Sequence, residues 1–357
     1  MSVRLSVAAW WMMMLGAVRA DITTVAHPGQ SLESARTVVW SPLFQASWDK
    51  LNARLDGPPL RVEPPNKLMA ALDSFRWEPG KVMPEGSWKA WCGPATRDFL
   101  KQVNAEASAI TGEQAGPFTL MEESEASLAF FGILDRQVEF QRSFFRSVKA
   151  PMNFRTKDAE HPVRFFGVRD ESSEDFSSAV RVLAWRPLDG SHAIQIRCRQ
   201  ADDSVILYLP PRDQDFATAC RWIRTWRSQF KPDAASARAW NDKLIHRNDE
   251  IQIPYVSLES KADLAPLLGG SRYHRKSTVP WLVSRAEQLT RFQLHEKGAR
   301  VRVEVSGMAD PFGEAPLVVP RRFLYNRPFF VFLWRDQAEW PYFGAWIGDE
   351  SALEPFR

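Results

Sequence analysis

The C-terminal segment from Phe292 onward restricts the fold more than any other part of the chain. It begins Phe-Gln-Leu-His-Glu-Lys-Gly, and charged and apolar residues then alternate from Arg300 to Val305. A stretch punctuated by glycine and proline follows, from Gly307 to Pro320, and an apolar block runs from Arg322 to Trp334. Alternation with a period of two predicts a strand, whereas Gly and Pro mark loops. The segment therefore predicts two strands joined by a long, exposed loop, an arrangement that offers a segment to a partner.

The N-terminus predicts export. Met1 to Arg4 is a short basic start, Leu5 to Val18 is almost wholly apolar, and Val18-Arg19-Ala20 has the small-residue spacing of a cleavage site. The apolar run is too short for a membrane span, so residues 1–20 are predicted to be a signal peptide and residues 21–357 one domain. The alternative is a short N-terminal anchor. A signal peptide places the mature protein in an extracellular or periplasmic compartment.

Charge and composition argue against nucleic acid and membrane partners. The 357-residue chain is 45% apolar and 25% charged, which is ordinary for a globular protein. Its formal net charge of +3 includes Arg4 and Arg19 of the predicted signal peptide. Without them 44 basic residues face 43 acidic ones, so no nucleic-acid or membrane partner is expected.

The residues that carry enzyme chemistry form no recognisable motif. There is no Gly-x-Ser-x-Gly, no His-Glu-x-x-His and no phosphate-binding glycine loop, and the six histidines are dispersed. Cys92, Cys198 and Cys220 form no Cys-x-x-Cys pair and are predicted to be buried free thiols. We therefore expect no enzyme activity, no metal and no cofactor. A secreted hydrolase whose catalytic residues are distant in sequence is the alternative.

Hydrophobic periodicity predicts a mixed α+β domain with at least one large sheet. The apolar run Leu128 to Leu134 is typical of a strand covered on both faces, and residues 60–90 are interpreted as loops around one short helix. Helices are predicted between Phe44 and Gly57 and at residues 68–75, 95–110, 215–230 and 260–268, and strands at 127–140, 163–168, 180–185, 192–199, 205–209 and 251–256.

An ordered set of motifs spans nearly the whole mature chain. They are Trp40-Ser-Pro-Leu-Phe44, Phe130 to Phe144 followed by Pro151-Met-Asn-Phe154, Val180 to Trp185, Val205 to Pro210, Ile251 to Gly270, Glu296-Lys-Gly298 and Asn326-Arg-Pro-Phe-Phe330. In this order they resemble the motifs of serpins. No single motif is specific, and the resemblance rests on the set.

The resemblance implies an α+β fold with three β-sheets and an exposed C-terminal reactive loop. It also implies a serine-type endopeptidase inhibitor in which a protease cleaves the loop and forms an acyl-enzyme. The loop then inserts into the main sheet and distorts the protease. In the family, the segment between the second helix and the following strand often carries a glycosaminoglycan-binding helix. The corresponding segment here, which ends at the strand predicted from Ser127, is short, so no glycosaminoglycan cofactor is expected. The protein is expected to be a monomer.

The resemblance places the hinge of the loop at Glu296, Lys297, Gly298 and Ala299, and then at Val301, Val303 and Val305 on one face of a strand. Because side chains of a strand alternate between faces, Arg300, Arg302 and Glu304 would then point to solvent. This pattern fits a hinge that inserts and equally a strand that already lies in the sheet.

The resemblance also locates the region where the sheet opens, called the shutter, and two candidate scissile bonds. The shutter corresponds to Ser41, Phe44, Gly132 and Gln288, and three of these depart from the polar residues usual in the family. Counting from either end of the loop gives Phe312–Gly313 or Leu317–Val318. Either bond suits a chymotrypsin-like protease with an apolar specificity pocket. The alternative is a non-inhibitory binding protein with the same fold.

Overall fold

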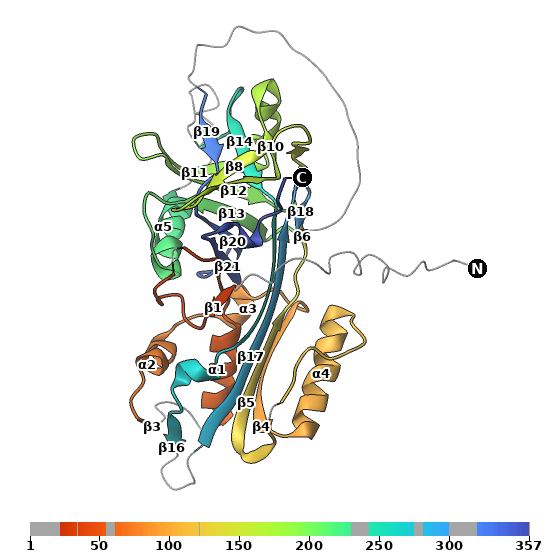
Figure 1. Ribbon diagram of the computed structural model, residues 1–357, viewed down its shortest axis with the longest axis vertical. Helices are drawn as coiled ribbons and strands as arrows, with labels where there is room; N and C mark the ends of the chain where they lie inside the picture. Colours follow the sequence, from red (N-terminus) through yellow and green to blue (C-terminus); the bar gives the residue numbers. More distant parts are fainter. Residues whose placement is uncertain are drawn as a thin grey trace, which may run out of the picture.

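The computed structural model describes residues 22–33, 35–54, 61–120, 122–229, 243–274, 281–299 and 320–356. Two large sheets dominate the fold, and the helices lie on their faces (Figure 1). The predicted α+β class with three principal sheets is confirmed: the sheets have seven, six and four strands, and two strand pairs are added to them.

The seven-stranded sheet forms the upper core of the molecule in Figure 1. Its strands, in spatial order, are β1 (Thr23–Val25), β2 (Val38–Trp40), β21 (Phe343–Ile347), β20 (Phe329–Arg335), β13 (Asp203–Leu209), β12 (Ser191–Arg197) and β11 (Val180–Arg186). Every residue of β13 and β21 is buried, which explains the continuous apolar runs of these strands. Helix α5 (Phe216–Gln229) packs on this sheet with Phe216, Ala219 and Ile223 inward.

The six-stranded sheet positions the candidate site. Its order is β3 (Arg61–Glu63), β16 (Arg272–His274), β17 (Trp281–Leu294), β5 (Ser124–Leu134) and β4 (Trp88–Ala95), and β15 (Val256–Asp263) also pairs with β17. Strands β5 and β17 pair in parallel, from Ser127–Leu282 to Leu134–Thr290. The other pairs of this sheet are antiparallel. We call the β5–β17 pair the seam.

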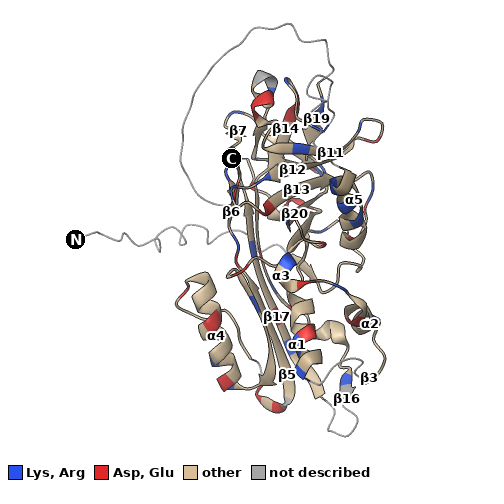
Figure 2. Ribbon diagram, turned by 180° about the vertical axis from the view of Figure 1, so that it is seen from behind, with Lys and Arg blue, Asp and Glu red and all other residues tan. Residues whose placement is uncertain are grey.

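Helices cover both faces of the seam. Helix α1 (Leu43–Arg54) lies on the inner face, where Phe44 and Trp48 meet Phe130 of β5. Helix α4 (Arg97–Thr111) lies on the outer face, where Val103 and Ala107 belong to the cluster around Phe131. Figure 2 shows the same two helices from behind, on either side of the sheet. The prediction that residues 128–134 form a strand covered on both faces is confirmed.

The remaining elements are small. The four-stranded sheet consists of β19 (Arg322–Leu324), β14 (Glu250–Pro254), β10 (Phe165–Val168) and β7 (Phe145–Arg146). Two strand pairs join β18 (Gly298–Ala299) to β6 (Val138–Glu139) and β8 (Met152–Arg155) to β9 (Glu160–Val163). The short helices are α2 (Lys67–Ser74), α3 (Pro79–Val82), η2 (Asp170–Phe176), η4 (Ala265–Leu268) and η5 (Glu350–Ala352).

Two local predictions are wrong. The stretch 60–90 contains β3, α3 and the start of β4 as well as the predicted short helix. Strand β4 was missed because Gly93 and Pro94 interrupt its pattern, and an edge strand tolerates both residues. Residues 260–263 continue strand β15 against β17, and only 265–268 are helical, as a 3-10 turn.

The cysteines and His192 have structural roles. Cys198 and Cys220 are buried and Cys92 is partly buried, and all three are free thiols. Burial raises the pKa of Cys92 to about 12, so its thiol stays protonated at neutral pH. Burial also lowers the pKa of His192 to about 3, and its ring packs edge-on against Phe323 and Tyr325.

Candidate functional site

The candidate site is the pair of strand ends from which the predicted loop leaves, together with the seam below them. Strand β17 ends at Leu294, and β19 begins at Arg322. Twenty residues, 300–319, separate the described ends of the chain at this point. The hinge residues Val301, Val303 and Val305 and the scissile-bond candidates Phe312, Gly313, Leu317 and Val318 all lie outside the described residues.

A tight turn reverses the chain directly after β17. The His295 amide donates to the Gly298 carbonyl at 3.0 Å, and the Gly298 amide donates back to the His295 carbonyl at 3.1 Å. Gly298 has φ +121°, and a Cβ atom there would lie 2.5 Å from the Val138 carbonyl oxygen. Only glycine fits both constraints, which gives a physical reason for the Glu-Lys-Gly motif.

The turn brings the first hinge residues between two strands. Gly298 bridges His295 on one side and pairs with Glu139 of β6 on the other, and Ala299 pairs with Val138. Strand β6 follows β5 along the chain, so β18 lies between the end of β17 and the continuation of β5 and is antiparallel to β6. Below it the seam closes at the Leu134–Thr290 pair. The described part of the hinge therefore stands at the upper end of a closed seam.

A buried carboxylate fixes the turn. Glu296 is 4% exposed; its Oε1 accepts from Arg146 Nε at 2.5 Å and its Oε2 from the Tyr255 hydroxyl at 2.8 Å. Burial alone would raise the pKa of Glu296, but the hydrogen bonds from Tyr255 and Arg146 outweigh it and hold the pKa below its ordinary value. Backbone bonds from Phe140 to Lys297 and from Phe144 to Glu296 complete the anchor.

A fully buried ion pair fixes the other described end, before β19. Arg321 and Asp249 are 4% and 1% exposed. The Arg321 amide donates to Asp249 Oδ1 at 2.9 Å, and its guanidinium Nη2 donates to Oδ2 at 2.6 Å. Strand β19 then pairs in parallel with β14, from Arg322–Glu250 to Leu324–Gln252. An arginine paired with a buried carboxylate thus holds each described end; Arg321 is itself buried, whereas the Arg146 side chain is 50% exposed.

Two of the four predicted shutter residues, Gly132 and Gln288, lie in the seam; Phe44 lies on the helix below it, and Ser41 is buried just before that helix. Gly132 and Gln288 face each other across the seam, and a Cβ atom on Gly132 would lie 3.1 Å from Leu43 Cβ at the start of α1. Phe44 packs edge-on against Phe130, 5.9 Å between ring centroids. Ser41 Oγ and Gln288 Oε1 are buried without a hydrogen-bond partner among the described residues. Gln288 Nε2 makes one long bond, 3.4 Å, to Thr290 Oγ1. Among the described residues, these four side chains therefore form no hydrogen-bonded network with one another.

The outer face of the seam is crossed by residues 112–119, which we call the crossing loop. The Glu113 carboxylate pairs with Arg291 of β17, and the Thr119 amide donates to Glu287 of the same strand at 3.0 Å. Phe118 packs against Phe131 of β5, 5.1 Å between ring centroids. The crossing loop therefore joins both strands of the seam on this face.

The resemblance located the hinge residues Glu296 to Ala299, but sequence reasoning predicted neither the turn nor its partners. Arg146 and Asp249 lie outside the motifs that resemble serpins, and Tyr255 lies inside one, Ile251 to Gly270, without a predicted role. Each is far in sequence from the residue that it holds. The alternation of β-strand residues around Tyr255 gave no sign that its hydroxyl would meet Glu296. No group of three or more His, Cys, Asp or Glu side chains in the described ranges is placed to hold a metal ion. The same ranges contain no helix long and apolar enough to cross a membrane.

We predict that Glu296→Gln removes part of the acid sensitivity of the fold. A carboxyl group whose pKa is lower in the folded state stabilises that state above its ordinary pKa, near 4.5 for Glu296. This contribution is lost as the pH falls through the folded-state pKa. Thermal unfolding of the Gln variant should therefore show a smaller loss of Tm between pH 7 and pH 3 than the parent. Glu160→Gln, at a side chain that is 57% exposed, is the control and should match the parent. Parallel pH curves for parent and Glu296→Gln would contradict the prediction.

We predict that Asp249→Asn destabilises the protein by about 3–5 kcal/mol, because it leaves the buried Arg321 guanidinium without a countercharge. Glu250→Gln changes the neighbouring carboxylate, whose partner Arg322 has a side chain 71% exposed, and should cost less than about 1 kcal/mol. Urea unfolding measures both changes. Equal midpoints for the two variants would show that the buried pair does not anchor β19.

Comparison with known proteins gives matches to solved structures alone. No family model matches the chain, and no curated protein does. Over 72% of this chain a serpin from Schistosoma mansoni matches with 13% identity and a TM-score of 0.42; this chain spans 64% of that serpin. Manduca sexta serpin-12 matches over 71% of this chain with 14% identity and a TM-score of 0.44, and this chain spans 66% of that serpin. Human kallistatin matches over 71% of this chain with 13% identity and a TM-score of 0.45, and this chain spans 64% of kallistatin. These solved structures are serpins, the family that the sequence motifs resemble.

Proposed function

We propose that the chain is a secreted inhibitor of serine-type endopeptidases that traps its target by inserting the residues after Ala299 into the seam. One observation carries the proposal: β18 already lies between the end of β17 and β6, directly above a closed parallel pair. A strand that continues from β18 runs antiparallel to β17 and to β5. Insertion would therefore replace one parallel ladder by two antiparallel ladders, which are slightly more stable per residue.

The register of β18 can be extrapolated to Val303 and Val305. Gly298 and Ala299 pair with Glu139 and Val138, so the same register places Val303 opposite Leu134 and Val305 opposite Gly132. Leu134 is buried, and Gly132 faces Leu43 of α1. The valines would therefore enter the inner face of the sheet, where Leu43 of α1 already packs closely against Gly132, so α1 would have to shift slightly to admit Val305.

The proposed chemistry belongs to the protease. Its serine hydroxyl attacks the scissile carbonyl, forms an ester with the N-terminal part of the loop and releases the amine of the next residue. The freed segment can then move into the seam while still attached to the protease. Arg321 is not a scissile candidate, because its side chain is buried on Asp249. The apolar candidates Phe312 and Leu317 favour a chymotrypsin-like target.

We expect incubation of the mature protein with chymotrypsin to give a covalent complex on a denaturing gel, with a mass equal to that of protease plus the N-terminal fragment. Mass spectrometry of the released peptide should show a start at Gly313 or Val318. Val303→Asp places a charge on the inner face and should give cleavage without complex. Glu304→Gln is the matched control on the other face and should keep the complex. Cleavage of the parent without any covalent complex would exclude the trap.

The crossing loop favours a second candidate function, a non-inhibitory binding protein. Its contacts to β17 and β5 hold the seam closed, and Ile133, Phe131 and Leu289 form a buried cluster beneath it. The register above would place Arg302 and Glu304 on this covered face, where the sequence alone predicted solvent. Insertion therefore requires the crossing loop to move. A seam that cannot open leaves the chain without a trap.

Weakening the crossing loop should favour inhibition if the seam opens. Glu113→Gln removes a partly exposed ion pair to Arg291 and should speed insertion roughly two- to fivefold, as expected for a pair worth ~0.5–1 kcal/mol. The measurement is the number of inhibitor molecules consumed per protease inactivated, which should fall. Glu122→Gln, at an exposed position nearby, serves as the control. If neither the parent nor Glu113→Gln forms a complex, the binding-protein function is supported.

A further inference from the structure

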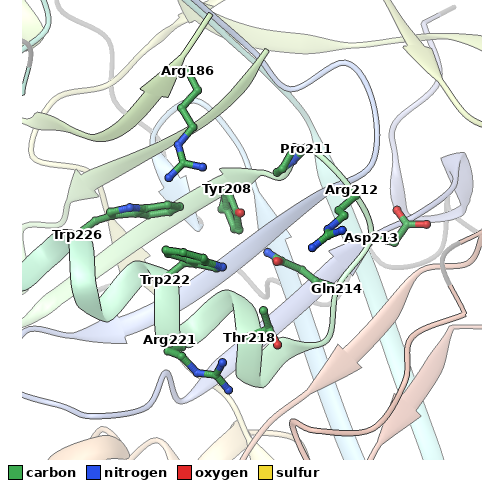
Figure 3. A pocket seen from close by; sticks show the side chains of 10 residues that line it. All are labelled: Arg186, Tyr208, Pro211, Arg212, Asp213, Gln214, Thr218, Arg221, Trp222 and Trp226. Carbon is green, nitrogen blue, oxygen red and sulfur yellow. The ribbon is translucent and has the colours of Figure 1, made fainter. Parts of the chain in front are cut away.

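A pocket of about 760 Å³ lies beside α5, away from the candidate site (Figure 3). Its walls are α5, the last residue of β11 and the loop of residues 211–214. This volume is in the range of sites that hold small organic molecules. The residues that line it bring aromatic rings and positive charge together.

Aromatic rings form one wall. Trp222 and Trp226 lie one turn apart on α5 and stack, with ring centroids 6.0 Å apart and planes inclined by 21°. Tyr208 of β13 meets Trp226 edge-on at 5.2 Å. Trp222 is 43% exposed, although Trp, when exposed, is usually found where a partner covers it. A flat apolar ligand could bury this surface.

Positive charge surrounds the rings. The Arg186 guanidinium lies 5.9 Å from the centroids of both tryptophans, and Figure 3 shows it pointing toward them. Arg212 and Arg221 also line the pocket, whereas Asp213 is the one carboxylate among the lining residues. None of the three arginines forms an ion pair within 4 Å in the part of the chain that the structure describes. The pocket therefore carries net positive charge that an anionic ligand would balance.

We propose that this pocket binds a small aromatic anion, a flat ring system that bears a sulfonate, sulfate or carboxylate group. The ring would contact Trp222, and the anionic group would meet Arg186 and Arg212, which suit planar oxyanions through paired N–H donors. Arginine and tryptophan act together here, so neither an uncharged ring nor a non-aromatic anion satisfies the site. The inference is independent of the proposed inhibitory function, because none of the lining residues belongs to the seam or to the loop ends.

The probe is 8-anilinonaphthalene-1-sulfonate, and its matched control is N-phenyl-1-naphthylamine, which has the same rings without the sulfonate. Calorimetry and fluorescence with the folded mature protein should show one sulfonate bound per chain. The uncharged analogue should bind at least tenfold more weakly, which corresponds to about 1.4 kcal/mol. Equal affinity for the two probes would overturn the proposal, because it would show an apolar surface without anion selectivity.

Variants test the two contributions separately. Trp222→Ala and the double change Arg186→Gln with Arg212→Gln should each raise the Kd of the sulfonate at least about tenfold. Arg224→Gln is the control on the same helix, since Arg224 pairs with Glu339 at 2.6 Å outside the pocket. Unfolding curves of all variants show whether the fold is kept, and the arginine variants keep the test valid if Trp222→Ala does not fold. An unchanged Kd in the arginine variants would exclude the site. A second result would also exclude the site: a heparin fragment displaces the probe, and the Trp222→Ala variant binds the probe as tightly as the parent does.

Discussion

The parallel pairing of β5 and β17 is the constraint on which the candidate site depends. A strand inserted between two parallel strands can run antiparallel to both, although β5 and β17 are at present hydrogen-bonded directly to each other. The chain supplies such a strand, because the turn after β17 reverses direction and sets Gly298 and Ala299 above the seam. Had β5 and β17 been antiparallel, a strand returning from β17 would have been parallel to β5. The gain in ladder stability would then have been smaller.

Ion pairs with buried carboxylates determine where motion could begin and end. Glu296 with Arg146 and Arg321 with Asp249 hold the two ends of residues 300–319 to the four-stranded sheet and its neighbours. Breaking a buried pair leaves an uncompensated charge, so these ends resist displacement more than an exposed contact would. An inserting strand would therefore start after Ala299 and leave the turn intact. Cleavage between the anchors would release the N-terminal part while β19 stays in place.

The sequence predicted the mixed α+β class and the strand covered on both faces, because each has a local pattern. Leu128 to Leu134, for example, is a continuous apolar run. The turn at Gly298 was not predicted, because the resemblance placed only hinge residues there. Strand β4 was not predicted, because Gly93 and Pro94 interrupt its apolar pattern at a sheet edge. The roles of Arg146, Tyr255 and Asp249 were not predicted for another reason. An ion pair or hydrogen bond between residues far apart in sequence produces no periodic sequence pattern. The same holds for the pocket, since Arg186 and Trp222 meet only through packing of α5 on the sheet.

The two faces of the seam differ in the side chains that they could accommodate from residues 300–305. The inner face beside Gly132 and Leu134 is apolar and packs against Leu43, so apolar residues such as Val303 and Val305 match it in chemistry, although not yet in space. The outer face is already filled by Phe131 and Leu289 beneath Phe118, so Arg302 and Glu304 could be accommodated only after the crossing loop moves. Burying those charges without partners would cost more than the added ladder returns. The proposed insertion would thus require the crossing loop to move on the outer face and Leu43 to shift on the inner face.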